Sequence, residues 1–253
     1  MTNNSLKISI ITIVYNRSET VSQALESIFS QRYSNFETIV VDGGSTDGTL
    51  LVIDKYIKNI NIFIAEKDDG IYDALNKGVA LATGDVIGIL HADDLLENND
   101  ILYKISNVFA DPSIEAVYGD LVYVKSNNIN QVIRYWKAGI YDQSSFKRGW
   151  MPPHPTLYLR RSVYERFGLF DIRYRISADY DAILRFLAIE KVRTAYIPEI
   201  LVRMRAGGIS NRSLANIINK SLEDFDIIRR YNMGGVLTLL LKNIRKFRQF
   251  LYR

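Results

Sequence analysis

The first 112 residues alternate short apolar runs with segments of helical spacing, and this alternation limits the fold more than any other feature. The apolar runs lie at 8–14, 37–41, 60–65 and 84–90, and each is followed by polar residues and then by helix-spaced apolar positions. Continuous runs of this length are typical of parallel strands that are buried on both faces. The pattern predicts an α/β fold of Rossmann-like type, with a mostly parallel sheet, flanking helices and right-handed crossovers.

Helix starts are indicated by hydroxyl side chains that can accept hydrogen bonds from the first turn. We expect Ser18 to cap the first helix, Ser45 or Thr46 the second, and Ser177 a later helix over 177–189. A third early helix is predicted over 71–82, where Thr83-Gly84 stops it.

The chain changes character after Pro112, where the repeat gives way to shorter predicted strands and a mixed α+β pattern. These strands lie at 116–118, 121–125, 132–136 and 156–159, with a hairpin at Asn127-Asn128. Two amphipathic helices are predicted from Leu214 onward. We therefore expect one domain over 1–212, with halves at 1–112 and 113–212, and a C-terminal helical extension at 213–253.

Composition narrows the class of protein. The chain has no cysteine, which excludes disulfides and thiolate metal sites and fits a reducing compartment. Its start is interpreted as a first strand and not a signal peptide, and no apolar run approaches the roughly 20 residues of a membrane-spanning helix. The last twelve residues contribute +5 to a formal charge of +4, so the basic character is local. A general nucleic-acid surface is not implied.

Polar clusters follow all four predicted strands, at 15–16, 42–47, 66–69 and 91–94. The carboxyl ends of parallel strands meet at one edge of the sheet, and ligands of open α/β sheets bind there. Asp93 and Asp94 end a fully apolar strand, so their carboxylates are expected where a ligand can reach them. The sequence thus predicts one polar site assembled from four loops.

The loop DGGSTDGT at 42–49 matches neither common phosphate-binding motif. Its two glycines have P-loop spacing, but Thr49-Leu50 occupies the place of the required Lys-Ser/Thr pair, and Ser45 replaces a glycine of the dinucleotide fingerprint. ATPase and NAD-enzyme functions therefore lose their main support. Asp42 at the strand end could instead accept hydrogen bonds from a nucleobase or from sugar hydroxyls.

Five segments, taken in order and spacing, resemble the inverting family 2 glycosyltransferases with the GT-A fold. They are ITIVYNR at 11–17, VDGGSTDGT at 41–49, EKDDGIYDALNKG at 66–78, GDVIGILHADD at 84–94 and SADYD at 177–181. The resemblance implies a nucleotide-sugar donor, UDP by default, with Mg²⁺ or Mn²⁺ on its diphosphate and inversion at the anomeric carbon. It makes 1–112 the nucleotide-binding half and 113–212 the acceptor-binding half.

The resemblance also implies roles for single residues. Those implied to bind the nucleotide sugar are Thr12, Tyr15, Asn16, Asp42, Asp69, Asn76, Lys77, Ala92 and Asp93. Asp93 is implied as the metal ligand. His91 stands where the metal motif usually begins with aspartate, and it could ligate the metal, contact ribose or phosphate, or mark weaker metal dependence.

Asp179 matches the catalytic base of the family, with Ala178 in place of the preceding glutamate. Inverting displacement requires one carboxylate to take the proton of the acceptor hydroxyl, so a single base suffices. From position alone, a first-turn acid that stabilises its helix would be the favoured interpretation of Asp179, and the resemblance reverses this preference.

Three further residues are candidates for contacts with acceptor or phosphate. His154, within WMPPHPT, could contact either of them or hold its loop. Arg203 and Arg205 could reach the donor phosphates or lie at a solvated strand end.

The tail from Leu237 to Arg253 mixes apolar and basic residues. An amphipathic cationic helix of this kind can lie on an anionic membrane, although packing against its own domain or a second copy in a homo-oligomer is an alternative. We expect a cytoplasmic protein, or one bound peripherally at the inner face of the cytoplasmic membrane.

The leading hypothesis is inverting transfer of a sugar to a saccharide or polyprenyl-linked acceptor in the synthesis of a bacterial surface polysaccharide or glycoconjugate. One alternative is a metal-dependent nucleotidyltransferase or phosphohydrolase that uses Asp93 and Asp94. Another is a non-catalytic sugar-nucleotide-binding subunit, suggested by His91 and Ala178.

Overall fold

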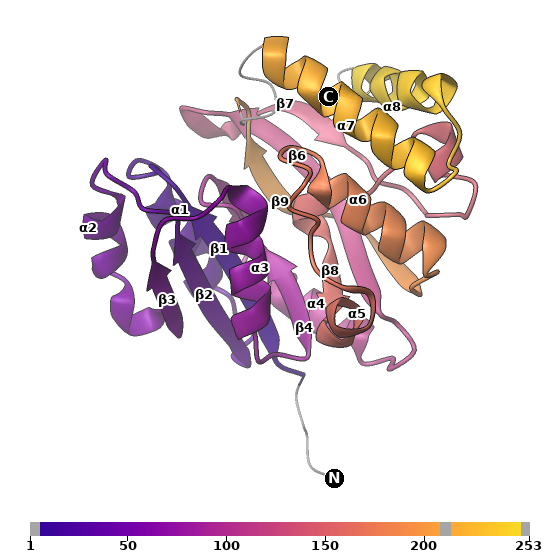
Figure 1. Cartoon of the computed structure of the whole chain (residues 1–253). Helices are drawn as coiled ribbons and strands as arrows, with labels where there is room; N and C mark the ends of the chain where they lie inside the picture. The colour runs from indigo at the N-terminus through magenta and orange to yellow at the C-terminus, as the bar shows by residue number, and fades with distance from the viewer. Residues whose placement is uncertain (1–5, 208–213, 249–253) are drawn as a thin grey trace.

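The fold is taken from a computed structural model, which describes residues 6–207 and 214–248 (Figure 1). In chain order the strands are β1 (Ile8–Val14), β2 (Phe36–Asp42), β3 (Ile62–Ala65), β4 (Val86–Ile89), β5 (Asp94–Leu96), β6 (Ala116–Lys125), β7 (Asn128–Trp136), β8 (Tyr158–Arg160) and β9 (Thr194–Arg205). The helices are α1 (Val21–Phe29), α2 (Thr49–Asp54), α3 (Ile71–Leu81), α4 (Ile101–Phe109), α5 (Arg161–Phe167), α6 (Ala178–Leu184), α7 (Leu214–Arg230) and α8 (Val236–Arg248). Short turns of other helical type are η1 (Ile57–Asn59), η2 (Phe146–Arg148), η3 (His154–Thr156) and the π-helical η4 (Arg185–Ile189).

The strands form one sheet in the order β3-β2-β1-β4-β8-β6-β9-β5, and β7 pairs with β6. The first four strands are parallel, as the sequence predicted. The antiparallel strand β8 then joins them to a mixed second half, in which β6 runs parallel to β9 and antiparallel to β7. The predicted α/β class and mixed second half are confirmed.

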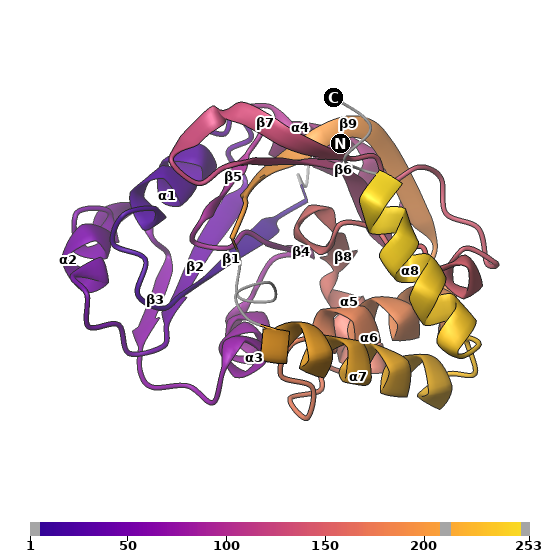
Figure 2. The same ribbon diagram turned by 90° about the horizontal axis from the view of Figure 1, so that it is seen from above.

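Alternate residues of the parallel strands pack against helices on opposite faces of the sheet (Figure 2). Ile8 and Ile10 of β1 share a core with Ile28 of α1 and with α4. Ile11 and Ile13, which point the other way, share a second core with α3. Because both faces are covered, the loops at the carboxyl ends are the open part of this half.

Two strand predictions need correction. The segments 116–118 and 121–125 are one continuous strand, β6, because Gly119 and Asp120 interrupt the apolar pattern but not the backbone pairing, which only shifts in register there. The strand predicted over 156–159 begins at Tyr158, and residues 154–156 form η3. The β6–β7 hairpin is confirmed.

The predicted helix caps were largely wrong, since none of the three helices has a capping hydrogen bond from the predicted hydroxyl group. Helix α1 starts at Val21 with Thr20 in the N-cap position, while the Ser18 hydroxyl binds Asp47. Gly48 occupies the N-cap position of α2, and Asp47 accepts the backbone N–H of Thr49 there. Ser177 is the N-cap residue of α6, but its side chain makes no capping hydrogen bond.

Helices α7 and α8 pack on the second half of the molecule, with α7 beside α6 and α8 folding back from its end (Figures 1 and 2). Ile227 and Ile228 of α7 join the core that contains α3 and α6. Helix α8 lies against η2, where the Thr238 hydroxyl donates to the Lys147 carbonyl at 3.1 Å. Within 6–207 and 214–248, none of the helices is both long and apolar enough to cross a bilayer.

Candidate active site

The loops after β1 and β2 are bonded to each other and form one framework. The backbone N–H of Asn16 donates to the Ser45 hydroxyl at 2.8 Å, and the side-chain oxygen of Asn16 accepts the backbone N–H of Thr46 at 2.8 Å. The Arg17 N–H donates to the Thr49 hydroxyl at 2.8 Å. Asn16 has φ of 50°, a left-handed conformation that is uncommon for a residue with a side chain. The cross-bonds hold it there, which is typical of a constrained site.

Asp42 fixes the second of these loops from within. It is fully buried, and its carboxylate accepts the N–H groups of Gly44 and Ser45 and the Ser45 hydroxyl. Thr12, also assigned to the nucleotide, is buried inside β1. Tyr15, in contrast, is 60% exposed at the strand end, where its ring is open to a ligand.

The loop after β3 lies against the glycines of the β2 loop. A Cβ atom on Gly43 would lie 2.2 Å from a carboxylate oxygen of Asp68, so Gly43 leaves the space that Asp68 occupies. Asp69 beside it is exposed. The side chains of Asn76 and Lys77 on α3 bind other groups of the protein. The Asn76 amide exchanges two hydrogen bonds with the Phe170 backbone, and the Lys77 ammonium pairs with Glu66 at 2.8 Å and Asp73 at 3.1 Å.

The loop between β4 and β5 presents Asp93 at the same edge. The Asp93 side chain is 28% exposed, and Arg17 Nε lies 3.6 Å from Oδ2. Ala92 is buried beneath the loop. Asp94 is also buried, and burial together with the neighbouring Asp93 raises its pKa well above the usual range. Asp93 is therefore the accessible carboxylate of the pair.

Arg203 and Arg205 lie in β9, where they support this loop. The Arg205 guanidinium is buried, donates to the Asp93 carbonyl at 2.7 Å and also binds Gln23. Arg203 pairs with Glu97 at 2.7 Å and donates to the Ile129 carbonyl at 3.1 Å. In this structure neither arginine lies at a solvated strand end.

Asp179 enters from the start of α6, on the other half of the molecule. Its Oδ2 lies 3.3 Å from His154 Nδ1, and its Oδ1 lies 3.1 Å from the Tyr72 hydroxyl, which is also 2.8 Å from the Ile176 carbonyl. The His154 ring meets the His91 ring edge to face at 5.6 Å. Three segments far apart in sequence, around 91, 154 and 179, thus converge.

The charge states follow from burial and neighbouring charges. Burial lowers the pKa of His154 to about 4 against the pull of Asp179, and burial likewise lowers the pKa of His91 against Asp93 and Asp179. Burial alone would raise the pKa of Asp179, but His154, Lys220 and Lys242 outweigh it and the net shift is downward. At neutral pH the centre therefore holds a carboxylate beside two neutral imidazoles.

The donor set suits a divalent cation with few protein ligands. Within the described ranges, no three His, Asp or Glu side chains converge on a closed metal site. Asp93 offers a partly exposed carboxylate and His91 a neutral imidazole on the same loop. Mg²⁺ is usually bound by one or two carboxylates plus substrate phosphates, so the residues present fit a metal whose other ligands come from a diphosphate.

Sequence reasoning missed two residues of this site. Tyr72 lies inside the segment 66–78 and reaches Asp179 across the two halves, while Arg17 ends the segment 11–17 and pairs with Asp93. Both stand within the quoted motifs, which is the one signal the sequence offered for them. Asp179 lies 107 residues from Tyr72 in the sequence, so this contact could be found only from the fold.

The fold and the arrangement of the site define a glycosyltransferase of GT-A type. The family model described as glycosyl transferase family 2 matches residues 9–168, and the chain belongs to this family. It is 34% identical over 209 residues to a PGL/p-HBAD biosynthesis glycosyltransferase of Mycobacterium bovis, covering 80% of this chain and 78% of that protein. It is 31% identical over 223 residues to an uncharacterized glycosyltransferase of Nostoc sp., covering 83% and 68%.

Solved structures share the fold at lower identity. The mannosyltransferase PcManGT from Pyrobaculum calidifontis, in complex with GDP-Man and Mn²⁺, has a TM-score of 0.69 at 20% identity and covers 96% of this chain and 72% of its own. S. aureus TarS 1–349 in complex with UDP has a TM-score of 0.64 at 17% identity and covers 89% and 72%. These neighbours bind different nucleotides, so the fold alone leaves the base of the donor open.

Proposed function

We propose that the protein transfers a sugar, with inversion, from a nucleotide-sugar donor, most simply a UDP-sugar, to a hydroxyl group of a saccharide or polyprenyl-linked saccharide. It would act in the cytoplasm, with a lipid-linked acceptor presented at the inner face of the cytoplasmic membrane. The observation that carries this proposal is the position of Asp179, a carboxylate that faces the donor loops from the opposite half of the molecule.

Asp179 is proposed as the base. Inversion requires the acceptor oxygen to attack the anomeric carbon from the side opposite the leaving group and to lose its proton to a carboxylate. The downward shift of its pKa keeps Asp179 ionised at neutral pH. His154 and Tyr72 hold its two oxygens, which leaves the side chain oriented as well as 19% exposed. One base in a fixed orientation is what a single displacement needs.

The opposite loops are proposed to hold the donor. Tyr15 offers an exposed ring to the nucleobase, and the buried Asp42 shapes the loop below it. Asp69, Asn76 and Lys77 are proposed to border the nucleotide through the α3 side of the site. A divalent cation bound by Asp93, with His91, would neutralise the leaving diphosphate. Asp93 would contribute the carboxylate oxygen, and Arg205 would hold its loop in place.

The test is a panel of UDP-, GDP- and dTDP-sugars, each scored for thermal stabilisation of the protein in the presence of Mn²⁺. The donors that bind are then assayed for transfer and for hydrolysis, with metal and with chelator. We expect stabilisation by one nucleotide class, metal-dependent transfer and a product of inverted anomeric configuration by NMR. Phosphoester products would favour the nucleotidyltransferase or phosphohydrolase alternative, and binding without turnover would favour the non-catalytic subunit.

A further inference from the structure

The outward face of α7 and α8 is unusually apolar. Seven of the eighteen large hydrophobic side chains exposed in the described residues belong to these two helices. They are 45–69% exposed, and they include Ile218 and Leu222 on α7 and Leu237 and Leu240 on α8. Contiguous exposed apolar surface on a folded domain marks an interaction site more often than chance does.

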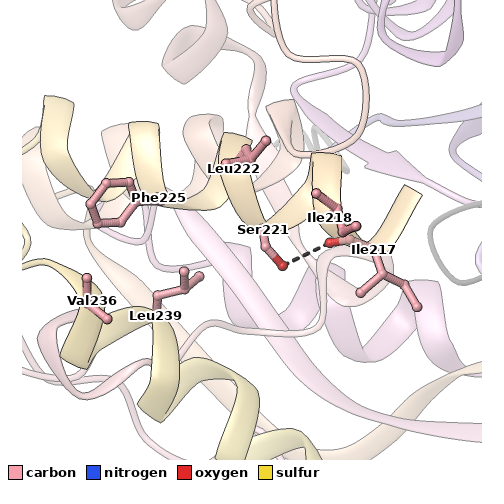
Figure 3. Close-up of a pocket in the computed structure, with 7 residues that line it drawn as sticks. All are labelled: Ile217, Ile218, Ser221, Leu222, Phe225, Val236 and Leu239. Carbon is pink, nitrogen blue, oxygen red and sulfur yellow. Dashed lines mark hydrogen bonds between the residues drawn. The ribbon is translucent and has the colours of Figure 1, made fainter. Parts of the chain in front are cut away.

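A groove between the two helices continues this face. Its volume is about 330 Å³. Leu222 and Phe225 of α7 and Val236 and Leu239 of α8 are among its lining residues, and Figure 3 shows Phe225 on the side of α7 that faces Val236 and Leu239. Pockets that hold small apolar ligands begin near this size, at roughly 300 Å³. The groove therefore has room for part of an acyl chain.

The charges of the two helices are predominantly basic. Helix α8 carries four basic residues and no acid. The three acids of α7 are all engaged: Glu223 accepts backbone N–H groups of the loop before α6, Asp224 pairs with Lys242 at 2.8 Å, and Asp226 accepts the Tyr174 hydroxyl at 2.6 Å. In the part of the two helices that the structure describes, the exposed charged residues are Arg229, Arg230 and Arg245 against one acid, Asp226.

The helices are attached firmly enough to orient the catalytic half. The Lys242–Asp224 pair is buried, and the Lys242 ammonium lies 3.2 Å from the centroid of the Tyr180 ring. Gly149 has φ of 72°, and a Cβ atom there would lie 2.2 Å from the Lys242 backbone nitrogen. This close approach fixes α8 against the loop that follows η2.

We propose that the α7–α8 face docks onto an anionic lipid bilayer, with its apolar side chains in the acyl boundary and its cations at the headgroups. The proposal deepens the proposed function and rests on it, because the lipid-linked acceptor that docking would serve is part of that function. Docking through a rigid helix pair would hold Asp179 at one height above the membrane surface.

The test is co-sedimentation of the full chain with phosphatidylcholine vesicles, prepared with and without phosphatidylglycerol. We expect binding that depends on the anionic lipid, falls with added salt, and drops about tenfold or more in a Leu237→Ser/Leu240→Ser variant. The matched control is Leu51→Ser/Ile140→Ser, which removes the two most exposed of the apolar side chains outside this face and is expected to bind as the parent does. Nucleotide-induced stabilisation verifies the fold of each variant.

Failure to bind anionic vesicles, or unchanged binding by the α8 variant, would overturn the proposal. So would a dimer in light scattering that the α8 variant disrupts while vesicles capture neither protein, because the face would then be a contact between copies. The readout needs no turnover, so an inactive but vesicle-bound protein would contradict the proposed function alone.

A second, independent observation concerns Glu223 of α7. Its carboxylate accepts the backbone N–H groups of Arg175 at 3.0 Å, Ile176 at 2.9 Å and Ser177 at 2.8 Å. These are the three consecutive residues before α6, whose second residue is Asp179. The Ser177 side chain makes no cap at this helix start, so Glu223 supplies acceptors that the segment itself lacks.

We infer that Glu223 is a positioning residue for Asp179, an inference that rests on the proposed function. By fixing the backbone that enters α6, it fixes where the Asp179 carboxylate stands relative to the donor loops. Small displacements of a reacting group cost up to roughly 10²-fold in rate. Helix α7 would then help to position the proposed base, in addition to forming part of the C-terminal extension.

The test compares Glu223→Ala, Glu223→Gln and Asp226→Asn. Asp226 is the matched control, since it also ties α7 to this loop, through Tyr174, but does not touch the residues next to Asp179. We expect kcat to fall about tenfold or more in Glu223→Ala and less in Glu223→Gln, which keeps one acceptor oxygen, with KM for the donor unchanged. Asp226→Asn should keep its kcat.

Parent-like kcat in Glu223→Ala, or an equal loss in Asp226→Asn, would refute the positioning role while leaving transfer itself established. Hydrogen exchange gives a readout that does not depend on turnover. The amides of 175–177 should exchange faster in Glu223→Ala than in Asp226→Asn, and equal protection in all three proteins would contradict the inference.

Discussion

Acidic residues lie at both ends of the parallel strands, but their carboxylates differ in how completely they are hydrogen-bonded. At the amino ends, Glu37 is buried and accepts hydrogen bonds from the Lys7 ammonium at 2.6 Å, the Ser9 hydroxyl, and the backbone and side chain of Thr83. At the carboxyl ends, Asp42 is bonded in a similar way, but the partly exposed Asp93 faces Arg17 at 3.6 Å and keeps a carboxylate that a ligand can reach.

This difference separates acids that stabilise the fold from acids that are kept available. Burial alone would raise the pKa of Glu37, but its hydrogen bonds outweigh burial and bring the pKa down to about 2. A carboxylate so fully bonded has no capacity left for a ligand. Native proteins satisfy almost all buried polar groups, so a partly exposed and weakly paired carboxylate such as Asp93 indicates a place where a ligand completes the pairing.

The largest effect is expected at Asp179. The Asp179→Asn variant keeps the shape of the side chain but cannot accept the acceptor proton. We expect turnover to fall roughly 10³-fold, or ~4 kcal/mol in activation free energy, with nucleotide binding retained. Steady-state kinetics and nucleotide titration measure the two quantities. Asp181→Asn, on the same helix, is the control, and parent-like turnover in Asp179→Asn would remove it as the base.

Asp93 comes next. The Asp93→Ala variant should lose about 10²-fold in activity, or ~3 kcal/mol, together with the response of nucleotide binding to Mn²⁺. Asp94→Asn is the matched control, because Asp94 is adjacent in sequence but buried, so its replacement removes no accessible carboxylate. Titration of nucleotide with and without metal compares the variants. An unchanged metal response in Asp93→Ala would exclude it as a ligand.

Much of the fold could be predicted because each parallel strand corresponds to a continuous apolar run in the sequence. The strand β6 was split in the prediction because Asp120 lies in its middle. That acid is buried and accepts the Ala138 N–H at 2.8 Å and the Tyr196 hydroxyl at 2.7 Å. Its partners lie 18 and 76 residues away, so no local pattern shows that they exist.

Residues of the candidate site could be proposed from the sequence where a motif contains them, but not where contact with a distant side chain decides their role. Asp93 and Asp179 stand in quoted segments, but the contacts of Tyr72 and Glu223 with the Asp179 region depend on how α3 and α7 pack. The helical spacing in α7 predicted an amphipathic helix. It did not reveal that Ile218 and Leu222 face outward. Helical spacing shows that apolar residues share one face of a helix, but it does not show whether that face points to the core or to solvent.

At the opposite end of the strands, Glu37→Gln should cost stability and not activity. Loss of hydrogen bonds to a buried charged group is worth about 2 kcal/mol. The folded pKa of about 2 lies below the ordinary 4.5, so the contribution is complete above pH 4.5 and is lost as pH falls toward 2. Urea unfolding across this range measures it. Glu199→Gln, which breaks only the exposed pair with Lys104, should change little, and an equal effect would contradict the comparison.

The smallest effect is expected at His154, which tests whether Asp179 is oriented by its polar contact with the imidazole Nδ1 or by packing alone. His154→Phe keeps a ring beside His91 but removes the Nδ1 contact, whereas His154→Asn can keep a donor near the Nδ1 position. We expect about a tenfold loss, or ~1.4 kcal/mol, in His154→Phe and less in His154→Asn. Because His154 helps to lower the pKa of Asp179, its removal should raise that pKa and move the acid limb of the kcat/KM profile to higher pH. Equal losses with no shift of the limb would assign His154 to packing and leave Tyr72 as the partner that orients the base.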